Sequence, residues 1–332
     1  METVAFFDAK PYDKLWFDQL KQQHGIELKY YENRLNRDTA VMAGGARAVV
    51  AFVADKIDAP TIDMLVNVGV EAVALRSSGY NHVDLKYADG KLRIFRVPAY
   101  SPNAVAEHAM ALLLCLNRKI HRAYNRVREY NFNLKGLVGF DLKGKTAGVV
   151  GAGKIGQAFI DICLGFGMKV LAYDPEPIRR VGVEYVSLHD LCRQSNIISL
   201  HCPLTKDSHH IIGRDTLRMM SEGVVILNTS RGALIDSEAL LDAIKTGRVA
   251  AAGLDVYEEE SDFFYEDVSG DVIQDDKLKL LLATPNVLVT SHQGFLTEEA
   301  LREIAKTTLQ NLSDHFAGRP AENEVSYMTA SV

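Results

Sequence analysis

Short apolar runs alternate with amphipathic stretches along the chain. In its first third, the apolar runs bounded by turn-forming residues cover residues 4–9, 48–53, 72–76 and 93–97. Runs this short and this continuously apolar are typical of strands buried on both faces of a parallel sheet. Apolar positions at helical spacing over residues 12–23 and 61–67 place helices between these strands. The pattern predicts a first parallel α/β unit.

A much longer helical pattern follows. Apolar positions continue at helical spacing through residues 103–129, without glycine or proline. We expect one helix here, long enough to bridge two domains.

A second set of apolar runs begins after this stretch, at residues 146–150, 169–173, 196–201, 224–229, 250–254 and 286–290. Helical segments lie in most of the connections, so the second sheet should also be parallel and doubly wound, with its ligand crevice at the carboxyl ends of the strands. An amphipathic helix over residues 297–316 could return to the first unit. The predicted domains are then 1–100 with 298–332, and 101–297.

Composition limits the classes of protein to consider. The 332 residues are 47% hydrophobic and 24% charged, as in globular proteins, and a net charge of −6 gives no basic surface for nucleic acid or membranes. The first residues lack the pattern of a secretory signal, and the longest apolar run, residues 109–116, is far shorter than the roughly 20 residues that span a bilayer. We expect a cytoplasmic protein. The four cysteines form no C-x-x-C pair, so neither a disulfide framework nor a metal site is predicted.

A glycine motif follows the first strand of the second set. Residues 151–156 read G-A-G-K-I-G and open a helical pattern. Here Gly151 permits a tight turn, Gly153 lets the backbone approach a pyrophosphate, and Gly156 permits close helix packing. Eighteen positions beyond Gly156, Asp174 ends the next strand, where a carboxylate accepts hydrogen bonds from a ribose diol and repels a 2′-phosphate. The motif predicts NAD rather than NADP. An ordinary glycine turn followed by a surface aspartate would have the same sequence pattern, however.

Further along the chain, an arginine, a run of glutamates and a histidine follow three other predicted strands. Arg231 can hold a carboxylate through two parallel hydrogen bonds, and His292 can donate a proton to a carbonyl oxygen as hydride arrives at carbon. A nearby glutamate could orient the imidazole, but spacing does not choose among the three consecutive glutamates 258–260. Arg231 could equally cap a surface turn, and His292 could be a hydrogen-bonded core residue. As a set, however, these groups are what reduction of a 2-oxo acid requires.

Several strings together resemble the D-isomer-specific 2-hydroxyacid dehydrogenase family, and its fermentative D-lactate dehydrogenases most. They are V-P-A-Y-S-P-N-A-V-A-E-H-A, G-V-V-G-A-G-K-I-G, I-S-L-H-C-P-L-T, L-N-T-S-R-G-A-L-I-D, G-L-D-V-Y-E and N-V-L-V-T-S-H-Q-G-F. The resemblance runs nearly end to end. It implies an α/β protein with two doubly wound parallel-sheet domains: a Rossmann-type NAD-binding domain and a smaller, flavodoxin-like substrate domain.

The resemblance also implies roles for individual residues. The family's catalytic arginine, glutamate and histidine fall on Arg231, Glu260 and His292, with the glutamate five positions after Asp255. The implied substrate-binding residues are Ser78, Gly79, Tyr100, Arg231, His292 and Phe295, with Trp16 as a further aromatic near the substrate methyl group. The implied cofactor contacts are Gly151, Gly153, Lys154, Ile155, Gly156, Asp174, Cys202, Pro203, Ser208, Thr229, Ser230, Arg231 and Asp255.

The implied activity is reversible NADH-dependent reduction of pyruvate to D-lactate by a homodimer or homotetramer. Larger 2-oxo acids such as phenylpyruvate or hydroxypyruvate are the alternative, because Gly294 stands where some relatives have alanine and could loosen the wall beside the histidine. A phosphorylated substrate would need cations near residues 77–79, where Arg76 is the one obvious candidate. A corepressor of the same fold, which works by binding partners, is a different class; the chain lacks the long disordered tails that would favour it.

Overall fold

The computed structural model describes residues 1–178, 180–260, 264–320 and 322–327. The chain forms two compact units. Unit 1 combines residues Met1–Ser101 with Leu296–Val332, and unit 2 is the continuous stretch Pro102–Phe295. The predicted boundaries lie one and two residues from these. Their division into a substrate and a coenzyme domain remains a prediction.

Unit 1 is built on a six-stranded sheet of order β13-β5-β4-β3-β1-β2. Its parallel part has the strand order 2-1-3-4-5 of flavodoxin-like folds, and β13 joins antiparallel to β5. All residues of β3 and β4 are buried, as their continuous apolar runs predict. The strands are β1 (Glu2–Phe6), β2 (Ile26–Tyr30), β3 (Ala48–Ala51), β4 (Ala72–Leu75), β5 (Arg93–Phe95) and β13 (Glu324–Val325).

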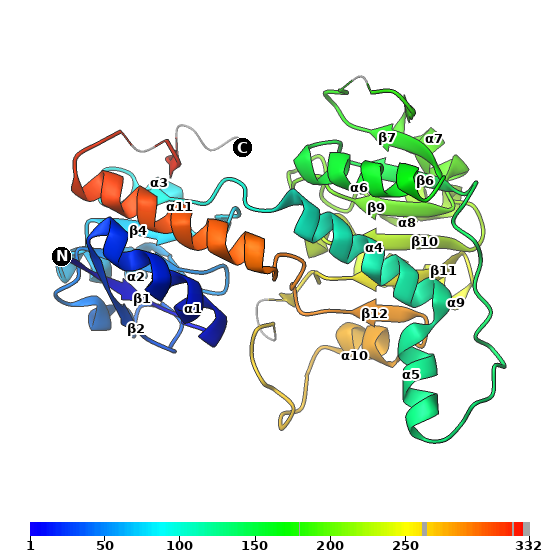
Figure 1. The fold of residues 1–332 in the computed structure, drawn as a ribbon, viewed down its shortest axis with the longest axis horizontal. Helices are drawn as coiled ribbons and strands as arrows, with labels where there is room; N and C mark the ends of the chain where they lie inside the picture. Colours follow the sequence, from blue (N-terminus) through cyan, green and yellow to red (C-terminus); the bar gives the residue numbers. More distant parts are fainter. Residues whose placement is uncertain (179, 261–263, 321, 328–332) are drawn as a thin grey trace. The chain divides into compact units, whose positions relative to one another are not determined.

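Helices from distant parts of the sequence pack against each other in unit 1. Figure 1 shows α11 (Glu298–Phe316), in orange, beside α1 (Pro11–Leu20), in blue, and the two helices are in contact. Thr297 caps α11 by accepting a hydrogen bond from the Ala300 amide, and acidic residues fill the first turn. The expected return of the last helix to the first unit is therefore observed. The other helical segments are η1 (Lys21–His24), η2 (Ala40–Ala43), α2 (Ala59–Asn67) and α3 (Leu85–Ala88).

Unit 2 is built on a seven-stranded parallel sheet of order β12-β11-β10-β9-β6-β7-β8. Numbered within the unit, the order is 3-2-1-4-5-6-7, the Rossmann arrangement with one added strand. The strand order reverses between β6 and β9, so the ligand crevice is expected beyond the carboxyl ends of these strands. The strands are β6 (Thr146–Val150), β7 (Lys169–Tyr173), β8 (Val183–Tyr185), β9 (Ile197–Leu200), β10 (Val224–Asn228), β11 (Val249–Leu254) and β12 (Val287–Val289).

Helices cover both faces of this second sheet. Apolar side chains of α4 and α6 pack with one set of strand residues, and those of the helices α7 to α10 pack with the other. Both faces are thus dry, as an all-parallel sheet requires. The helical segments are α4 (Pro102–Arg118), α5 (Ile120–Arg128), α6 (Lys154–Gly165), α7 (Leu188–Gln194), α8 (Arg214–Met219), η3 (Gly232–Leu234), α9 (Ser237–Lys245) and α10 (Asp276–Ala283).

One prediction about this unit was wrong. The pattern over residues 103–129 predicts a single helix, but the structure has α4 and α5, separated by Lys119 at a φ of +52°. A left-handed residue cannot continue a right-handed helix, so the chain changes direction there. No helix in the described part of the chain is long and apolar enough to cross a membrane.

Candidate active site

The glycine motif forms the turn between β6 and α6. Gly151 has a φ of +92°, and a Cβ there would lie 2.5 Å from the Cys202 backbone nitrogen. A Cβ on Gly156 would lie 2.0 Å from the Gly151 carbonyl oxygen, so the turn and α6 can approach this closely only without side chains. Gly153 differs, because a Cβ on it would meet no described atom within 4 Å. The turn therefore leaves open space in front of α6.

This open space fits the pyrophosphate of a dinucleotide. Gly153 is the N-cap of α6 and provides no side-chain cap. The amides at the start of α6 thus remain available as hydrogen-bond donors at the positive end of the helix dipole. Lys154 and Ile155 are the first two residues of the helix, where the backbone would meet a bound phosphate.

Asp174 follows β7 and is tied to the glycine turn. Its Oδ2 accepts a hydrogen bond from the Ala152 amide at 2.6 Å, and its Oδ1 accepts one from the Glu176 amide at 2.9 Å. The carboxylate is thereby held beside the turn, with further lone pairs for a ribose diol. The role expected of Asp174 in excluding a 2′-phosphate remains a prediction.

The loops after β9 and β10 lie against each other. The Ser230 hydroxyl donates to the Cys202 carbonyl at 2.6 Å, and burial raises the pKa of the Cys202 thiol to about 11. The Thr229 Oγ1 is buried and has no hydrogen-bond partner among the described residues, as expected of a group that meets a ligand. The Ser208 hydroxyl instead donates to the Pro203 carbonyl and accepts from the Thr205 amide, both at 2.7 Å. Ser208 therefore stabilises the conformation of its own loop.

Asp255, directly after β11, organises the loop that carries the histidine. Its carboxylate accepts hydrogen bonds from the Thr290 hydroxyl at 2.6 Å and from the amides of Gln293 and Gly294 at 2.9 and 2.8 Å. His108 of α4 lies 3.2 Å from the same carboxylate. Burial acts to raise the pKa of Asp255, but these partners hold it below its ordinary value. Asp255 is therefore a buried anion that fixes the loop around His292.

His292 is held from three sides. Its Nδ1 lies 2.8 Å from Glu260 Oε1, its amide donates to the Asp255 carbonyl at 2.7 Å, and its carbonyl accepts from the Tyr265 hydroxyl at 3.2 Å. Its backbone φ of +49° is rare for a residue with a side chain. Glu260 is itself fixed, since its Oε2 accepts from the Tyr257 amide at 3.0 Å. Nδ1 is thus engaged by a carboxylate, and Nε2 is the nitrogen left to meet a substrate.

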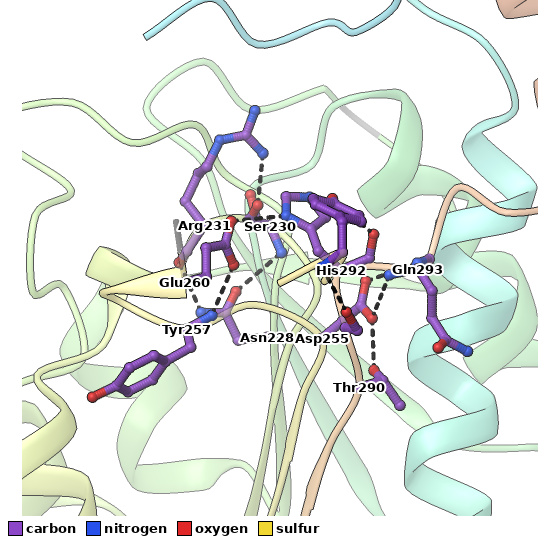
Figure 2. A network of polar contacts seen from close by, with 12 residues as sticks. Asn228, Ser230, Arg231, Asp255, Tyr257, Glu260, Thr290, His292 and Gln293 are labelled. Carbon is purple, nitrogen blue, oxygen red and sulfur yellow. Dashed lines mark hydrogen bonds and ion pairs between the residues drawn. The ribbon is translucent and has the colours of Figure 1, made fainter. Parts of the chain in front are cut away.

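Arg231 follows β10, so it lies at the carboxyl ends of the strands, as Glu260 and His292 do (Figure 2). Its Nη1 donates to the Ser230 carbonyl at 2.7 Å, and its own carbonyl accepts from the Asn228 side chain at 2.8 Å. The next residue, Gly232, packs so tightly that a Cβ would lie 2.0 Å from the Tyr257 carbonyl carbon. The loops that carry Arg231 and Glu260 are thus in backbone contact. The three predicted catalytic residues come from loops after β10, β11 and β12.

The predicted substrate contacts Ser78, Gly79 and Tyr100 belong to unit 1. Here the Ser77 hydroxyl donates to the Gly79 carbonyl at 2.9 Å, and the Arg96 side chain donates to the Ser78 carbonyl at 3.2 Å. The turn is therefore held by its neighbours, and Tyr100 is half-buried in the segment after β5. Their part in a site remains a prediction.

Two aromatic residues were expected near the substrate methyl group. Phe295 ends unit 2 and is buried. Trp16 is also buried, with the Arg302 guanidinium 4.9 Å from its ring, which is the environment of a packing residue in unit 1. At Gly294 a Cβ would lie 3.0 Å from Asp255 Oδ2, so the missing methyl group gives the Asp255 carboxylate room.

Sequence reasoning missed some residues that support the site. His108 and Thr290 were not singled out, yet they contact the Asp255 carboxylate. The role of Tyr265, whose hydroxyl donates to the His292 carbonyl, was not predicted either. The signal for His108 was present, because it lies in the string V-A-E-H-A used for the resemblance. Phe264 packs into the core of unit 2. Its neighbour Phe263 lies outside the described residues.

Known proteins resemble this chain over most of its length. Residues 110–294 match the family model described as D-isomer specific 2-hydroxyacid dehydrogenase, NAD binding domain. The chain is 49% identical over 326 residues to D-lactate dehydrogenase of Escherichia coli, covering 97% of this chain and 99% of that protein. Among solved structures, the apo form of the same Escherichia coli enzyme has a TM-score of 0.90 at 46% identity, covering 97% and 99% of the two chains. The pyruvate reductase of Chlamydomonas reinhardtii has a TM-score of 0.93 at 42% identity, covering 97% and 98%.

These likenesses extend over nearly the whole chain and include both sheets. The chain belongs to the D-isomer-specific 2-hydroxyacid dehydrogenase family and is an NAD-dependent oxidoreductase of D-2-hydroxy acids.

Proposed function

We propose that this enzyme reduces pyruvate to D-lactate, reversibly, with Arg231, Glu260 and His292 as its catalytic residues. The observation that carries the proposal is the 2.8 Å contact between Glu260 and His292 Nδ1, at the sheet edge where Arg231 also lies. Two relatives support the choice of substrate: one is named D-lactate dehydrogenase and the other is described as a pyruvate reductase.

Each of the three side chains has a part that follows from its chemistry. The Arg231 guanidinium pairs with the substrate carboxylate through parallel hydrogen bonds and polarises the neighbouring carbonyl. The Glu260 carboxylate fixes the orientation of the His292 ring through its 2.8 Å contact with Nδ1, which leaves Nε2 to face the substrate. His292 then donates a proton from Nε2 to the carbonyl oxygen, and takes it back in the oxidation direction. Bound NADH supplies the hydride for this step.

The coenzyme contacts follow from the described loops. The amides at the start of α6 would hold the pyrophosphate, Asp174 the adenosine ribose, and the buried Thr229 hydroxyl a polar group of the coenzyme. We further propose that the amides of Ser78 and Gly79 hold the substrate carboxylate, that Tyr100 points toward it, and that Phe295 limits the size of the substrate side chain.

A phosphorylated substrate is not supported by unit 1. Arg76 is 2% exposed, its Nη2 donates to the Asp8 carbonyl at 2.6 Å, and its Nη1 lies 3.3 Å from Asp13 Oδ2. The Phe52 ring stacks on its guanidinium at 4.0 Å. Its Nη2 also lies 3.7 Å from Asp8 Oδ2, so Arg76 serves as a buried counter-charge for two carboxylates and is not available for a phosphate.

The test is a substrate series at fixed NADH. We expect kcat/KM to be highest for pyruvate and lower for hydroxypyruvate, phenylpyruvate and 2-oxoisocaproate, with D-lactate as the product of the first. Chiral chromatography of the product checks the configuration. Higher kcat/KM with phenylpyruvate than with pyruvate would replace this proposal with that of a reductase of larger 2-oxo acids.

We also infer a cytoplasmic homo-oligomer. The feature that supports an oligomer is a set of exposed apolar side chains on α5 and the segment after it, namely Ile120, Tyr124, Val127, Tyr130, Phe132, Leu134 and Val138. Exposed apolar side chains that recur along one segment are a feature of subunit contacts. Light scattering of the purified protein measures the number of subunits.

A further inference from the structure

Glu258 lies two residues before Glu260, and its carboxylate contacts two other segments of unit 2. Its Oε1 lies 2.6 Å from His210 Nε2, and its Oε2 accepts a hydrogen bond from the Ser237 hydroxyl at 3.0 Å. His210 comes from the loop after β9, Ser237 is the first residue of α9, and Glu258 itself follows β11. The His210 and Glu258 side chains are 34% and 22% exposed, so water only partly competes for these contacts.

Both partners of Glu258 are fixed to the segment that carries Arg231. The His210 amide donates to the Ala233 carbonyl at 2.9 Å. Ser237 follows the same segment, and Gly232 presses its backbone against Tyr257 and Glu258. The carboxylate of Glu258 therefore bridges a preformed assembly of loops, and does not sit on a free surface.

The same turn holds the catalytic glutamate. The Tyr257 amide donates to Glu260 Oε2 at 3.0 Å, and Glu260 Oε1 faces His292 Nδ1 at 2.8 Å. Glu258 is covalently next to the residue that supplies this amide. Fixing Glu258 therefore fixes the direction in which the Tyr257 amide, and with it the Glu260 carboxylate, points.

We propose that Glu258 is a positioning residue: clamped by His210 and Ser237, it holds the turn 257–260 so that Glu260 meets His292 in the geometry needed for proton transfer. A proton donor must be oriented within a fraction of an ångström, and such precision comes from the residues behind it. The inference rests on the proposed catalytic roles of Glu260 and His292 and adds a residue behind them.

A cation site is the competing interpretation of these side chains. The His209 ring stacks on His210 at 3.9 Å, and ligand-type atoms of His209, His210 and Glu258 lie within 4.8 Å of one another. Both oxygens of Glu258, however, already contact protein groups at hydrogen-bond distance. A metal ion would have to replace these contacts, so the geometry favours the clamp.

The experiment compares three variants of the full-length enzyme. Glu258→Ala removes the clamp, Glu258→Gln keeps an acceptor and a donor for both partners, and Glu238→Ala is the matched control, because it removes an exposed ion pair with Arg214 next to Ser237. We expect Glu258→Ala to lower kcat by roughly 10- to 100-fold with NADH affinity unchanged. Glu258→Gln should stay within about 3-fold of the parent, and Glu238→Ala should match it.

A second background separates positioning from general loss of structure. If Glu258 acts through Glu260, then Glu258→Ala added to Glu260→Gln should cost less than about 2-fold more in kcat, because residues acting as a unit are not additive. Full additivity of the two losses, or an unchanged kcat in Glu258→Ala, overturns the proposal. If Glu258→Ala does not fold, Ser237→Ala replaces it, with a smaller loss of kcat expected and the same additivity test.

Two further outcomes have distinct meanings. Loss of parent activity in EDTA with recovery on adding Zn²⁺ would establish the cation site and overturn the clamp. If the parent enzyme reduces no 2-oxo acid at all, the result contradicts the proposed function itself. If the parent is active but insensitive to Glu258→Ala, the clamp alone fails.

Discussion

Gly232 gives the sharpest quantitative prediction, because its environment leaves no space for a side chain. A Cβ at this position would lie 2.0 Å from the Tyr257 carbonyl carbon, 2.1 Å from its oxygen and 2.3 Å from the Glu258 nitrogen. All three are backbone atoms and cannot rotate away. Because non-bonded carbons pack at about 3.5 Å or more, Gly232→Ala must push the two loops apart by more than ~1 Å.

This displacement acts directly on the catalytic groups. One of the two loops carries Arg231 and the other carries Glu260. A misplacement of about 1 Å costs on the order of 100-fold in rate, and overpacking costs roughly 1–3 kcal/mol in free energy of unfolding. We therefore expect Gly232→Ala to remain folded but to lose about two orders of magnitude in kcat/KM for pyruvate.

The assay combines initial rates of NADH oxidation with urea unfolding. Gly165→Ala is the matched control, since a Cβ on Gly165, the last residue of α6, would meet nothing described within 4 Å. It should keep full activity. A Gly232→Ala enzyme with kcat/KM within a few-fold of the parent would show that the two loops are not packed as described, and the reasoning would be wrong.

Three other predictions follow from the site and its surroundings. His292→Ala should lower kcat by roughly 10²- to 10⁴-fold while NADH binding, measured by fluorescence titration, changes little; near-parent turnover would remove the histidine from the mechanism. Asp174→Ala should narrow the preference for NADH over NADPH in kcat/KM, and an unchanged ratio would show that the carboxylate does not select the coenzyme. Burial lowers the pKa of His201 from 6.5 to about 3, so only the unfolded chain takes up this proton, and the contribution of His201 to stability is lost as the pH falls from about 6.5 towards 3. His201→Gln should remove about 1.4 kcal/mol per pH unit of that dependence, measured by urea unfolding at pH 5 and pH 7; identical slopes in the two proteins would refute it.

The sequence predicted the strands that lie in the middle of each sheet, because these are buried on both faces and read as continuous apolar runs. The ranges 146–150 and 169–173 agree with β6 and β7 residue for residue. The strands β2, β8 and β13 were missed. All three are edge strands, and their glutamates at positions 27, 184 and 324 interrupt the apolar pattern.

Local chemistry could be predicted better than the contacts that support it. The glycine turn and its following acid are set by neighbouring positions in the chain. The choice of Glu260 over Glu258 and Glu259 came from the family resemblance, and the structure places its carboxylate on His292. The role of Glu258, on the other hand, could not be predicted from spacing, because its partners His210 and Ser237 are 48 and 21 residues away in the sequence.

The discontinuity of unit 1 has a consequence for how the chain matures on the ribosome. The first hundred residues emerge long before β13 and α11. In the folded unit, β13 pairs with β5 at the edge of the sheet, and α11 packs against α1 and β4. Unit 2 is synthesised in one continuous stretch in between, so it can fold before the residues that complete unit 1 have been synthesised. During this interval we expect the uncovered apolar strands of residues 1–101 to be the part of the nascent polypeptide that chaperones bind.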